Sequence, residues 1–254
     1  MSKNFELLYQ VGKAGDMLRA DAEPVPAPVV DLPLDLSPSI PAVEIGGMAR
    51  EELTKLVHRL FLVGGEQGPR HVVFTGTELG NGCTWMCAHA AEILASQVGG
   101  SVCIVDGNLS SPSLHHQFGV ENHFGLADAL AGDGPIRQFA RQLSRSNLWL
   151  LSCGAVNENS QQLVASGRIR ARISELRAEF DYVLMDVAPM NVCNHTMTFG
   201  SLLDGVVLVI KATSTRRDWA REAVQQLRES NVRVLGVVLN ERTFPIPERI
   251  YKRL

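Results

Sequence analysis

The residues best suited to chemistry in this chain begin with a loop punctuated by glycines. Segment 75–84 (TGTELGNGCT) contains three glycines and ends in a threonine where a helix is expected to start. Glycines let backbone N–H groups surround phosphate oxygens, and the N-terminus of a helix adds positive charge. The threonine hydroxyl is a suitable ligand for Mg²⁺. The predicted nucleotide contacts in this loop are Gly80, Asn81, Gly82, Cys83, Thr84 and Trp85.

One position in this loop does not suit phosphate chemistry. A phosphate loop uses a lysine to reach the β- and γ-phosphates, and Cys83 stands at that position. A thiol supplies no positive charge. A glycine loop without lysine is equally compatible with a tight turn from strand to helix. A thiol at a helix N-terminus tends to have a lowered pKa, which would make Cys83 reactive if it is exposed.

Two aspartates follow apolar runs elsewhere in the chain. Asp106 lies in CIVDGNLSSP (103–112), and Asp186 lies in FDYVLMDVAP (180–189), which has the form of a Walker B segment. Ionised carboxylates bind hard cations well. We therefore predict Asp106 and Asp186 as the catalytic carboxylates, and Thr84, Asp106 and Asp186 as Mg²⁺ ligands. For Asp106 the alternative is that it only caps the end of a strand.

The elements that would position these residues alternate between strand and helix. Continuous apolar strands between helices predict a doubly wound α/β fold, a mainly parallel sheet with helices on both faces. Ligands bind at the carboxyl ends of such strands, so the loops after Thr75, Asp106 and Asp186 should meet. The expected strands are 71–75, 101–106, 147–152, 181–186, 205–210 and 232–239. The expected helices are 48–63, 84–98, 124–144, 161–179, 195–203 and 216–230.

The segments before this domain have a different composition. Residues 1–20 have apolar residues at helical spacing, and 21–45 are rich in proline, so we expect an N-terminal helix, an extended linker and a domain over 46–254. A net charge of −3 gives no case for nucleic acid as a partner. We find no membrane-spanning run or signal peptide and expect a cytoplasmic location. The five cysteines suggest no disulfide framework.

Over residues 48–240 the sequence resembles a known family, the bacterial tyrosine kinases of capsule and exopolysaccharide synthesis (CpsD/CapB-like), within the MinD/ParA-type P-loop ATPases. The resemblance implies a P-loop NTPase fold, ATP or ADP with Mg²⁺ as ligand, and Asn240 near the adenine base. It also implies a membrane partner, the inner-membrane polysaccharide co-polymerase, and homo-oligomers. The motifs that carry it are LGNGCTW (79–85), CIVDGNLSSP (103–112), HHQF (115–118), FGL (124–126), FDYVLMDVAP (180–189), LDGVVLVI (203–210) and VLGVVLN (234–240).

The departures from that family fall on positions that carry charge. Cys83 replaces the loop lysine, Asn108 the second acid of the DxD motif, and Ser110 the arginine after it. The E-x-x-R-x-x-R pattern of the family's oligomerisation helix is here Glu52, Lys55 and His58, and lysine lacks arginine's planar fork. The family's carboxy-terminal tyrosine cluster is absent as well. The three tyrosines are Tyr9, Tyr182 and Tyr251.

These losses favour a degenerate kinase-like subunit with a regulatory or scaffold role and weak or no nucleotide binding. The first alternative is an active kinase or ATPase with a compensating lysine, for which Lys211 and Lys252 are the local candidates. The second is a MinD/ParA-like localisation ATPase. A metal site at Cys83, Cys87 and His89 is disfavoured, because the histidine points away from the cysteines on a helix.

Overall fold

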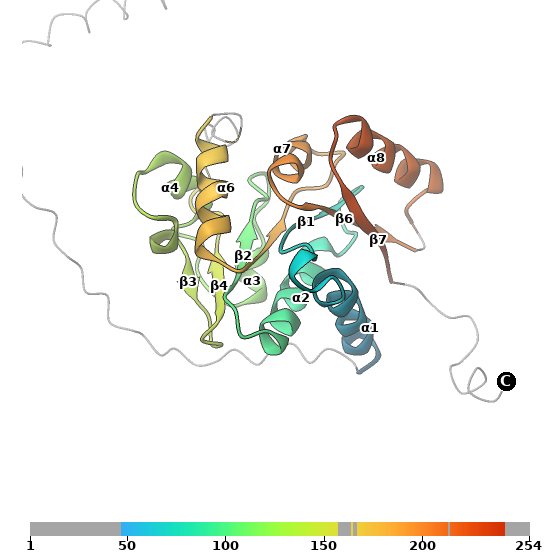
Figure 1. The fold of residues 1–254 in the computed structure, drawn as a ribbon. Coiled ribbons are helices and arrows are strands. Elements are labelled where there is room, and N and C mark those ends of the chain that lie inside the picture. Colours follow the sequence, from blue (N-terminus) through green and yellow to red (C-terminus); the bar gives the residue numbers. More distant parts are fainter. Residues whose placement is uncertain (1–46, 157–163, 165–166, 213, 242–254) are drawn as a thin grey trace, which may run out of the picture. The chain divides into compact units, whose positions relative to one another are not determined.

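The computed structural model describes residues 47–156, 164, 167–212 and 214–241 (Figure 1). The chain divides into two compact units, Met1–Pro38 and Ser39–Leu254, and every described residue belongs to the second. The predicted helix at 1–20 and linker at 21–45 lie outside the described residues, so both stay predictions.

The described part of the chain contains a seven-stranded sheet with the order β3-β4-β2-β5-β1-β6-β7. Every neighbouring pair is parallel except β3 and β4. This arrangement confirms the predicted mainly parallel sheet. The strands are β1 (His71–Gly76), β2 (Val102–Asp106), β3 (Arg141–Gln142), β4 (Leu148–Leu151), β5 (Tyr182–Asp186), β6 (Gly205–Lys211) and β7 (Val234–Asn240).

Helices cover both faces of the sheet, each over its own hydrophobic core. The central strands are apolar at successive positions because both of their faces are buried. One face is covered by α1 (Gly47–Val57), α2 (Cys83–Gln97) and α3 (Leu114–Gln117). The other is covered by α4 (Leu126–Ala131), α6 (Arg168–Glu179), α7 (His195–Leu202) and α8 (Arg217–Glu229).

One predicted helix has the expected extent and another was wrong. The helix expected over 48–63 is present as α1 continued directly by a π-helix at His58–Leu62, and a 3₁₀ turn at Gly65–Gln67 follows. The segment expected to be one helix over 124–144 instead forms α4, a 3₁₀ helix at Ile136–Phe139 and strand β3. This difference has a local cause, because Gly132, Gly134 and Pro135 interrupt the apolar pattern, and these residue types end helices.

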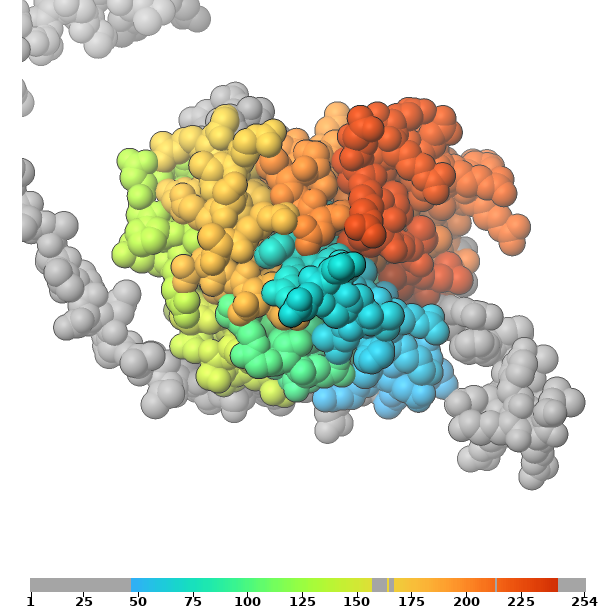
Figure 2. Space-filling view, viewed as in Figure 1, coloured from blue at the N-terminus to red at the C-terminus, as the bar shows by residue number. Residues whose placement is uncertain are grey.

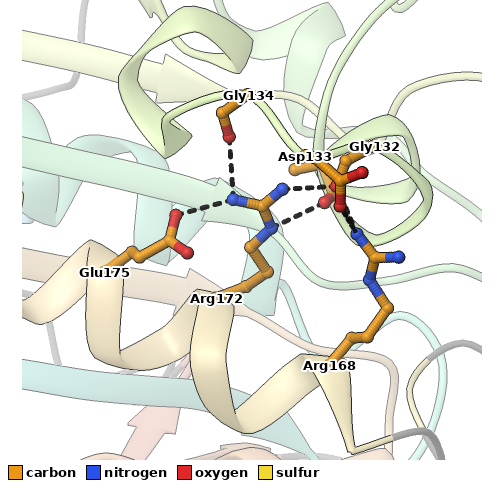
Figure 3. Close-up of polar contacts among 7 residues, drawn as sticks. Gly132, Asp133, Gly134, Arg168, Arg172 and Glu175 are labelled. Carbon is orange, nitrogen blue, oxygen red and sulfur yellow. Dashed lines mark hydrogen bonds and ion pairs between the residues drawn. The ribbon is translucent and has the colours of Figure 1, made fainter.

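The irregular segment after α4 is held by one buried arginine on α6 (Figure 3). Arg172 Nε donates to the Ala129 carbonyl at 2.7 Å, and its two terminal nitrogens donate to the carbonyls of Gly134 and Gly132. Glu175 pairs with the same guanidinium at 2.6 Å. The planar fork of donors therefore replaces the backbone hydrogen bonds that a continuous helix would have made.

Replacing Arg172 with methionine is expected to lower the free energy of unfolding by about 2–4 kcal/mol, because buried carbonyls lose charged donors. Urea unfolding of both proteins measures the difference. The matched control is Arg168→Met. Arg168 reaches Gly132 and Asp133 from the same helix, but its side chain is 45% exposed, so its loss should cost less than about 1 kcal/mol. Equal costs for the two variants would contradict this role for Arg172.

Candidate phosphate-binding site

The carboxyl ends of three adjacent central strands meet where the sequence places its chemistry. Strand β5 lies between β2 and β1, and Asp106 is directly opposite Asp186 in the register of β2 and β5. The Thr84 hydroxyl, at the start of α2, donates to Asp186 Oδ2 at 2.6 Å. The structure thus brings Thr84, Asp106 and Asp186 together, as the topology of a parallel sheet requires.

The glycine loop between β1 and α2 adopts backbone conformations that favour glycine. Gly80 and Gly82 have φ of +82° and +79°, in the left-handed region where other residues are strained. Between them the Asn81 side chain is buried and donates to the Thr77 hydroxyl and to the Val209 carbonyl, both at 3.0 Å. The loop is therefore anchored to β6 by a side-chain amide.

Asn240, at the end of β7, also holds this loop. Its side-chain amide donates to the Asn81 carbonyl at 2.9 Å. A Cβ on Gly82 would lie only 2.3 Å from the Asn240 nitrogen, so the close approach requires glycine there as well. The Asn240 amide therefore binds the backbone of the loop, which is the behaviour of a residue that caps the end of a strand. The adenine contact expected for Asn240 stays a prediction.

Asp106 is buried and is surrounded by backbone donors. Its carboxylate accepts hydrogen bonds from the N–H groups of Asn108, Ser113 and Leu114, at 3.0–3.1 Å. Burial raises the pKa of Asp106 to about 6, and these donors offset part of the effect. The Asn108 side chain, at the second acid position, accepts a hydrogen bond from the Ser111 N–H at 3.1 Å. The residue that replaced the acid therefore caps a turn.

Asp186 lies in a more demanding environment. Burial raises its pKa to about 7, and the neighbouring charge of Asp106 adds to the shift. Hydrogen bonds from the Thr84 hydroxyl and the Cys83 thiol act in the opposite direction. The two carboxylates thus sit side by side without a neighbouring ammonium or guanidinium partner among their described contacts.

The expectation of a lowered pKa for the Cys83 thiol was wrong. Burial, with the negative charge of Asp186, raises the pKa of Cys83 well above the usual value. Cys83 as a whole residue is half-buried. The carboxylate of Asp186 beside its thiol disfavours a second negative charge, so partial exposure of the residue does not lower the pKa. Cys83 is therefore a neutral thiol that donates toward Asp186, and the helix N-terminus does not activate it.

Trp85 and Lys211, two other residues from the sequence analysis, have their side chains engaged elsewhere. The Trp85 ring packs edge-on against His89 within α2, with the ring centres 4.5 Å apart. The ammonium of Lys211 pairs with Glu241 at 2.6 Å. Lys211 therefore already has an acidic partner at the end of β7, and Lys252 lies outside the described residues.

The donor set at this site suits Mg²⁺. Two carboxylates and a hydroxyl are hard oxygen ligands, and Mg²⁺ commonly takes one or two carboxylates together with substrate phosphates. Thr84, Asp106 and Asp186 would hold the ion, which would supply the positive charge that the side chains lack. Among the described residues no three His, Cys, Asp or Glu side chains gather into a metal cluster, so the two aspartates would need water or phosphate as further ligands.

Sequence reasoning missed the backbone donors that hold Asp106. Ser113 and Leu114 lie seven and eight residues after it and start the short helix α3. The signal was the run of serines and proline in 110–113, a typical helix-start composition. His116 also contributes, because its charge lowers the pKa of Asp106.

A pocket of about 300 Å³ lies beside the loop without including the two aspartates. It is formed between the residue after β1, the segment after β5 and α8. Neither aspartate lines it, so we place the chemistry at the hydrogen-bonded aspartates and not in the pocket. The lining residues are Thr77, Met190, Asn191, Trp219, Glu222, Ala223 and Gln226.

Known proteins match most of this chain. Residues 70–229 match the family described as cellulose biosynthesis protein BcsQ. The chain is 29% identical over 223 residues to the tyrosine-protein kinase EpsB of Ralstonia nicotianae. That match covers 84% of this chain but 30% of EpsB. It is 28% identical over 171 residues to tyrosine-protein kinase YwqD of Bacillus subtilis, and that match covers 67% of this chain and 72% of YwqD. The chain thus spans less than a third of EpsB.

Solved structures show the same fold. The chimerical protein CapA2B2 superposes with a TM-score of 0.71 at 21% identity, over 77% of this chain and 86% of the other. The septum site-determining protein MinD of Pyrococcus horikoshii, solved with Mg-ADP, gives 0.58 at 23% identity, over 72% and 76% of the two chains. These likenesses confirm the MinD/ParA-type P-loop fold. In the described part of the chain, no helix is long and apolar enough to cross a membrane.

The carboxylate pair predicts an unusual dependence of stability on pH. Both folded pKa values are raised above the usual 3.8, so between about pH 4 and 7 the folded state binds more protons than the unfolded state, and stability falls as the pH rises. Asp186→Asn should therefore raise the free energy of unfolding by about 2–4 kcal/mol at pH 8. The effect should be small at pH 4.5. Urea unfolding at both pH values measures it.

Asp204→Asn is the control with the opposite sign. Burial alone would raise the pKa of Asp204, but hydrogen bonds from His71 and from backbone N–H groups, with the charge of Arg177, hold that pKa far below its usual value. Its carboxylate therefore stabilises the fold above about pH 4, and Asp204→Asn should destabilise the protein at pH 8. If Asp186→Asn also destabilises it more at pH 8 than at pH 4.5, the prediction for the pair is wrong.

Proposed function

The chain belongs to the bacterial tyrosine-kinase family of MinD/ParA-type P-loop proteins, since residues 70–229 match the BcsQ family and its relatives are tyrosine-protein kinases. On that premise we propose that it is a catalytically degenerate member. In this proposal it is a cytoplasmic regulatory or scaffold subunit of exopolysaccharide biosynthesis or export. It acts through binding to an inner-membrane polysaccharide co-polymerase, and it binds nucleotide weakly or not at all.

The observation that carries this proposal is the pair of buried carboxylates without a lysine or arginine partner among their described contacts. Phosphoryl transfer depends on positive charge that neutralises the phosphate oxygens. At the lysine position the chain has a neutral thiol, which donates to Asp186 and therefore does not balance its charge. A triphosphate would bring several more negative charges into this pocket, and only Mg²⁺ could offset them.

The remaining substitutions point in the same direction. The second acid of the motif is replaced by Asn108, whose side chain accepts a hydrogen bond that closes a turn. Loss of one preorganised charge contact commonly lowers a rate by about 10²–10³, so the combined loss of the lysine and the acid should leave little activity. The backbone shape of the loop and the candidate metal ligands are retained. A retained scaffold with lost catalytic charges favours a role in binding the co-polymerase over a role in catalysis.

The main alternative is an active kinase or ATPase that obtains a lysine from elsewhere. Lys211 is a poor donor for its own site, because Glu241 already neutralises it. A lysine from another subunit would remain available to such an enzyme. The third hypothesis is a MinD/ParA-like localisation ATPase. Such a protein would share this fold, but it would need the same lysine-assisted ATP hydrolysis as the active kinase or ATPase.

Calorimetric titration separates these functions. With Mg²⁺–ATP or Mg²⁺–ADP, the wild-type protein is expected to show no saturable heat at nucleotide concentrations near 100 µM, roughly the range of ordinary enzyme ligands. The variant Cys83→Lys, Asn108→Asp should bind at least about tenfold more tightly, because it restores charge-assisted contacts to phosphate and metal. Cys83→Ser, Asn108→Asp is the control without the cation. Tight binding by the wild type would overturn the claim of weak nucleotide binding.

Hydrolysis tests the catalytic part separately. Wild-type protein with Mg²⁺–ATP should release phosphate no faster than Asp186→Ala, since the loss of cation and acid removes most of the stabilisation of the transition state. A steady-state phosphate assay measures both. Hydrolysis by the wild type that disappears in Asp186→Ala would reject the degenerate reading and favour an active ATPase.

A further inference from the structure

The carboxylates of Asp106 and Asp186 are enclosed by the fold without a fixed positive charge beside them. The two residues are 0% and 1% exposed. Among the described residues, no lysine or arginine contacts either carboxylate. Burial of ionised carboxylates is costly unless a cation balances them. A metal ion could do so, because carboxylates bind divalent ions directly.

The thiol of Cys83 adds a sulfur atom to these oxygen ligands. It forms a hydrogen bond with the Asp186 carboxylate. The Thr84 hydroxyl donates to Oδ2 of the same carboxylate at 2.6 Å. Two successive residues at the start of α2 therefore place sulfur and oxygen beside one carboxylate. A phosphate loop with a lysine at this position has no such sulfur.

Sulfur changes the metal ion that the site prefers. Mg²⁺ takes oxygen ligands and usually keeps several waters, whereas thiolates select Zn²⁺ and similar ions. Zn²⁺ lies about 2.3 Å from a thiolate sulfur and about 2.1 Å from a carboxylate oxygen, so at a tetrahedral angle the two ligand atoms are about 3.5 Å apart. An ion could thus replace the proton shared by Cys83 and Asp186 with small side-chain movements.

Solvent reaches these ligands from the side of the glycine loop. Cys83 and Thr84 are half-buried, while Asp106 and Asp186 are buried. Figure 2 shows the described segments packed closely together on the face drawn. An entering ion would therefore meet the sulfur of Cys83 before it meets the carboxylates.

We propose that a divalent ion of the Zn²⁺ class binds to the Cys83 sulfur and an Asp186 oxygen in the absence of nucleotide, and that it takes the place of the missing lysine charge. Asp106 adds a second negative charge from the neighbouring strand. No three described His, Cys, Asp or Glu side chains gather into a metal cluster, so water completes the coordination.

Binding exchanges a proton for the ion. The Cys83 S–H bond breaks, the bond between sulfur and metal forms, and the proton passes to solvent, with no electron transferred. The negative charge of Asp186 keeps the thiol protonated without metal, but a divalent ion offsets that charge and deprotonates a coordinating thiol. This site goes beyond the proposed function, because it needs no nucleotide.

The proposed ligands differ from the set Cys83, Cys87 and His89 that the sequence pattern offers. His89 Nδ1 already contacts Glu92 at 3.0 Å. Cys87 is fully buried one turn after Cys83. The carboxylate of Asp186, from a strand distant in the sequence, thus replaces the histidine as the partner of Cys83.

Cobalt(II) absorption tests for the bond to sulfur. Co²⁺ can replace Zn²⁺ in such sites, and a cobalt–thiolate bond gives a charge-transfer band that oxygen and nitrogen ligands alone do not give. The whole wild-type chain, reduced and without nucleotide at pH 8, should show a saturable band. Zn²⁺ should remove the band, and about a 100-fold excess of Mg²⁺ should leave it, because thiolates select Zn²⁺ over Mg²⁺.

Two variants locate the bond. Cys83→Ser should lose the band and bind Zn²⁺ at least about tenfold more weakly, since even residues that only support a metal ligand contribute that much. Cys193→Ser removes a half-buried cysteine outside the site and should keep the band. A band that persists in Cys83→Ser would show an adventitious ion only and would overturn the proposal, as would a wild-type protein without a saturable band.

Two further variants separate loss of the site from loss of the fold. Asp186→Asn should be more stable than the wild type at pH 8, yet it should also bind Zn²⁺ at least about tenfold more weakly. Cys83→Lys should bind Zn²⁺ weakly as well, because its ammonium would occupy the position of the ion. Calorimetric titration with Zn²⁺ measures both, and wild-type affinity in either variant would overturn the proposal. Since no nucleotide is present, tight ATP binding would reject the proposed function and leave this result unaffected.

Discussion

The candidate site depends on two ionisable oxygens that the fold forces together. Asp106 and Asp186 end neighbouring parallel strands in register, so the sheet itself brings their carboxylates to one point. Burial makes both of them harder to ionise, with pKa values of about 6 and 7. The surrounding donors are backbone N–H groups, a hydroxyl and a thiol, all uncharged. None of the described lysine or arginine side chains balances these carboxylates, and only the charge of His116 lowers the pKa of Asp106 from a distance.

The loop next to this pair keeps its form through contacts that do not involve charge. Asn81 reaches β6 and Asn240 reaches back to the loop from β7. Both interactions are neutral amide hydrogen bonds, so they are insensitive to the loss of the lysine at position 83. This explains how the geometry of a phosphate loop persists in a chain whose electrostatics oppose a polyphosphate. A binding role and a catalytic role make different demands on the same residues.

The fold could be predicted from the sequence because its strands are apolar over their whole length and end in distinctive residues such as Asp106 and Asp186. The extent of α4 was not predicted, since its apolar spacing continues past Gly132 while the backbone turns. The structure shows that a distant residue, Arg172, holds that turn. Similarly, the state of Cys83 depends on Asp186, 103 residues later in the numbering. Local patterns do not contain such information.

The contact between Gly82 and Asn240 has a consequence for how such a chain can change over evolutionary time. The two positions constrain each other, because a side chain at 82 would collide with the amide at 240. Cys83 and Asn108 lie outside this pair of positions. Substitutions at 83 and 108 can therefore change the charge of the site without touching the contact that fixes the loop to β7.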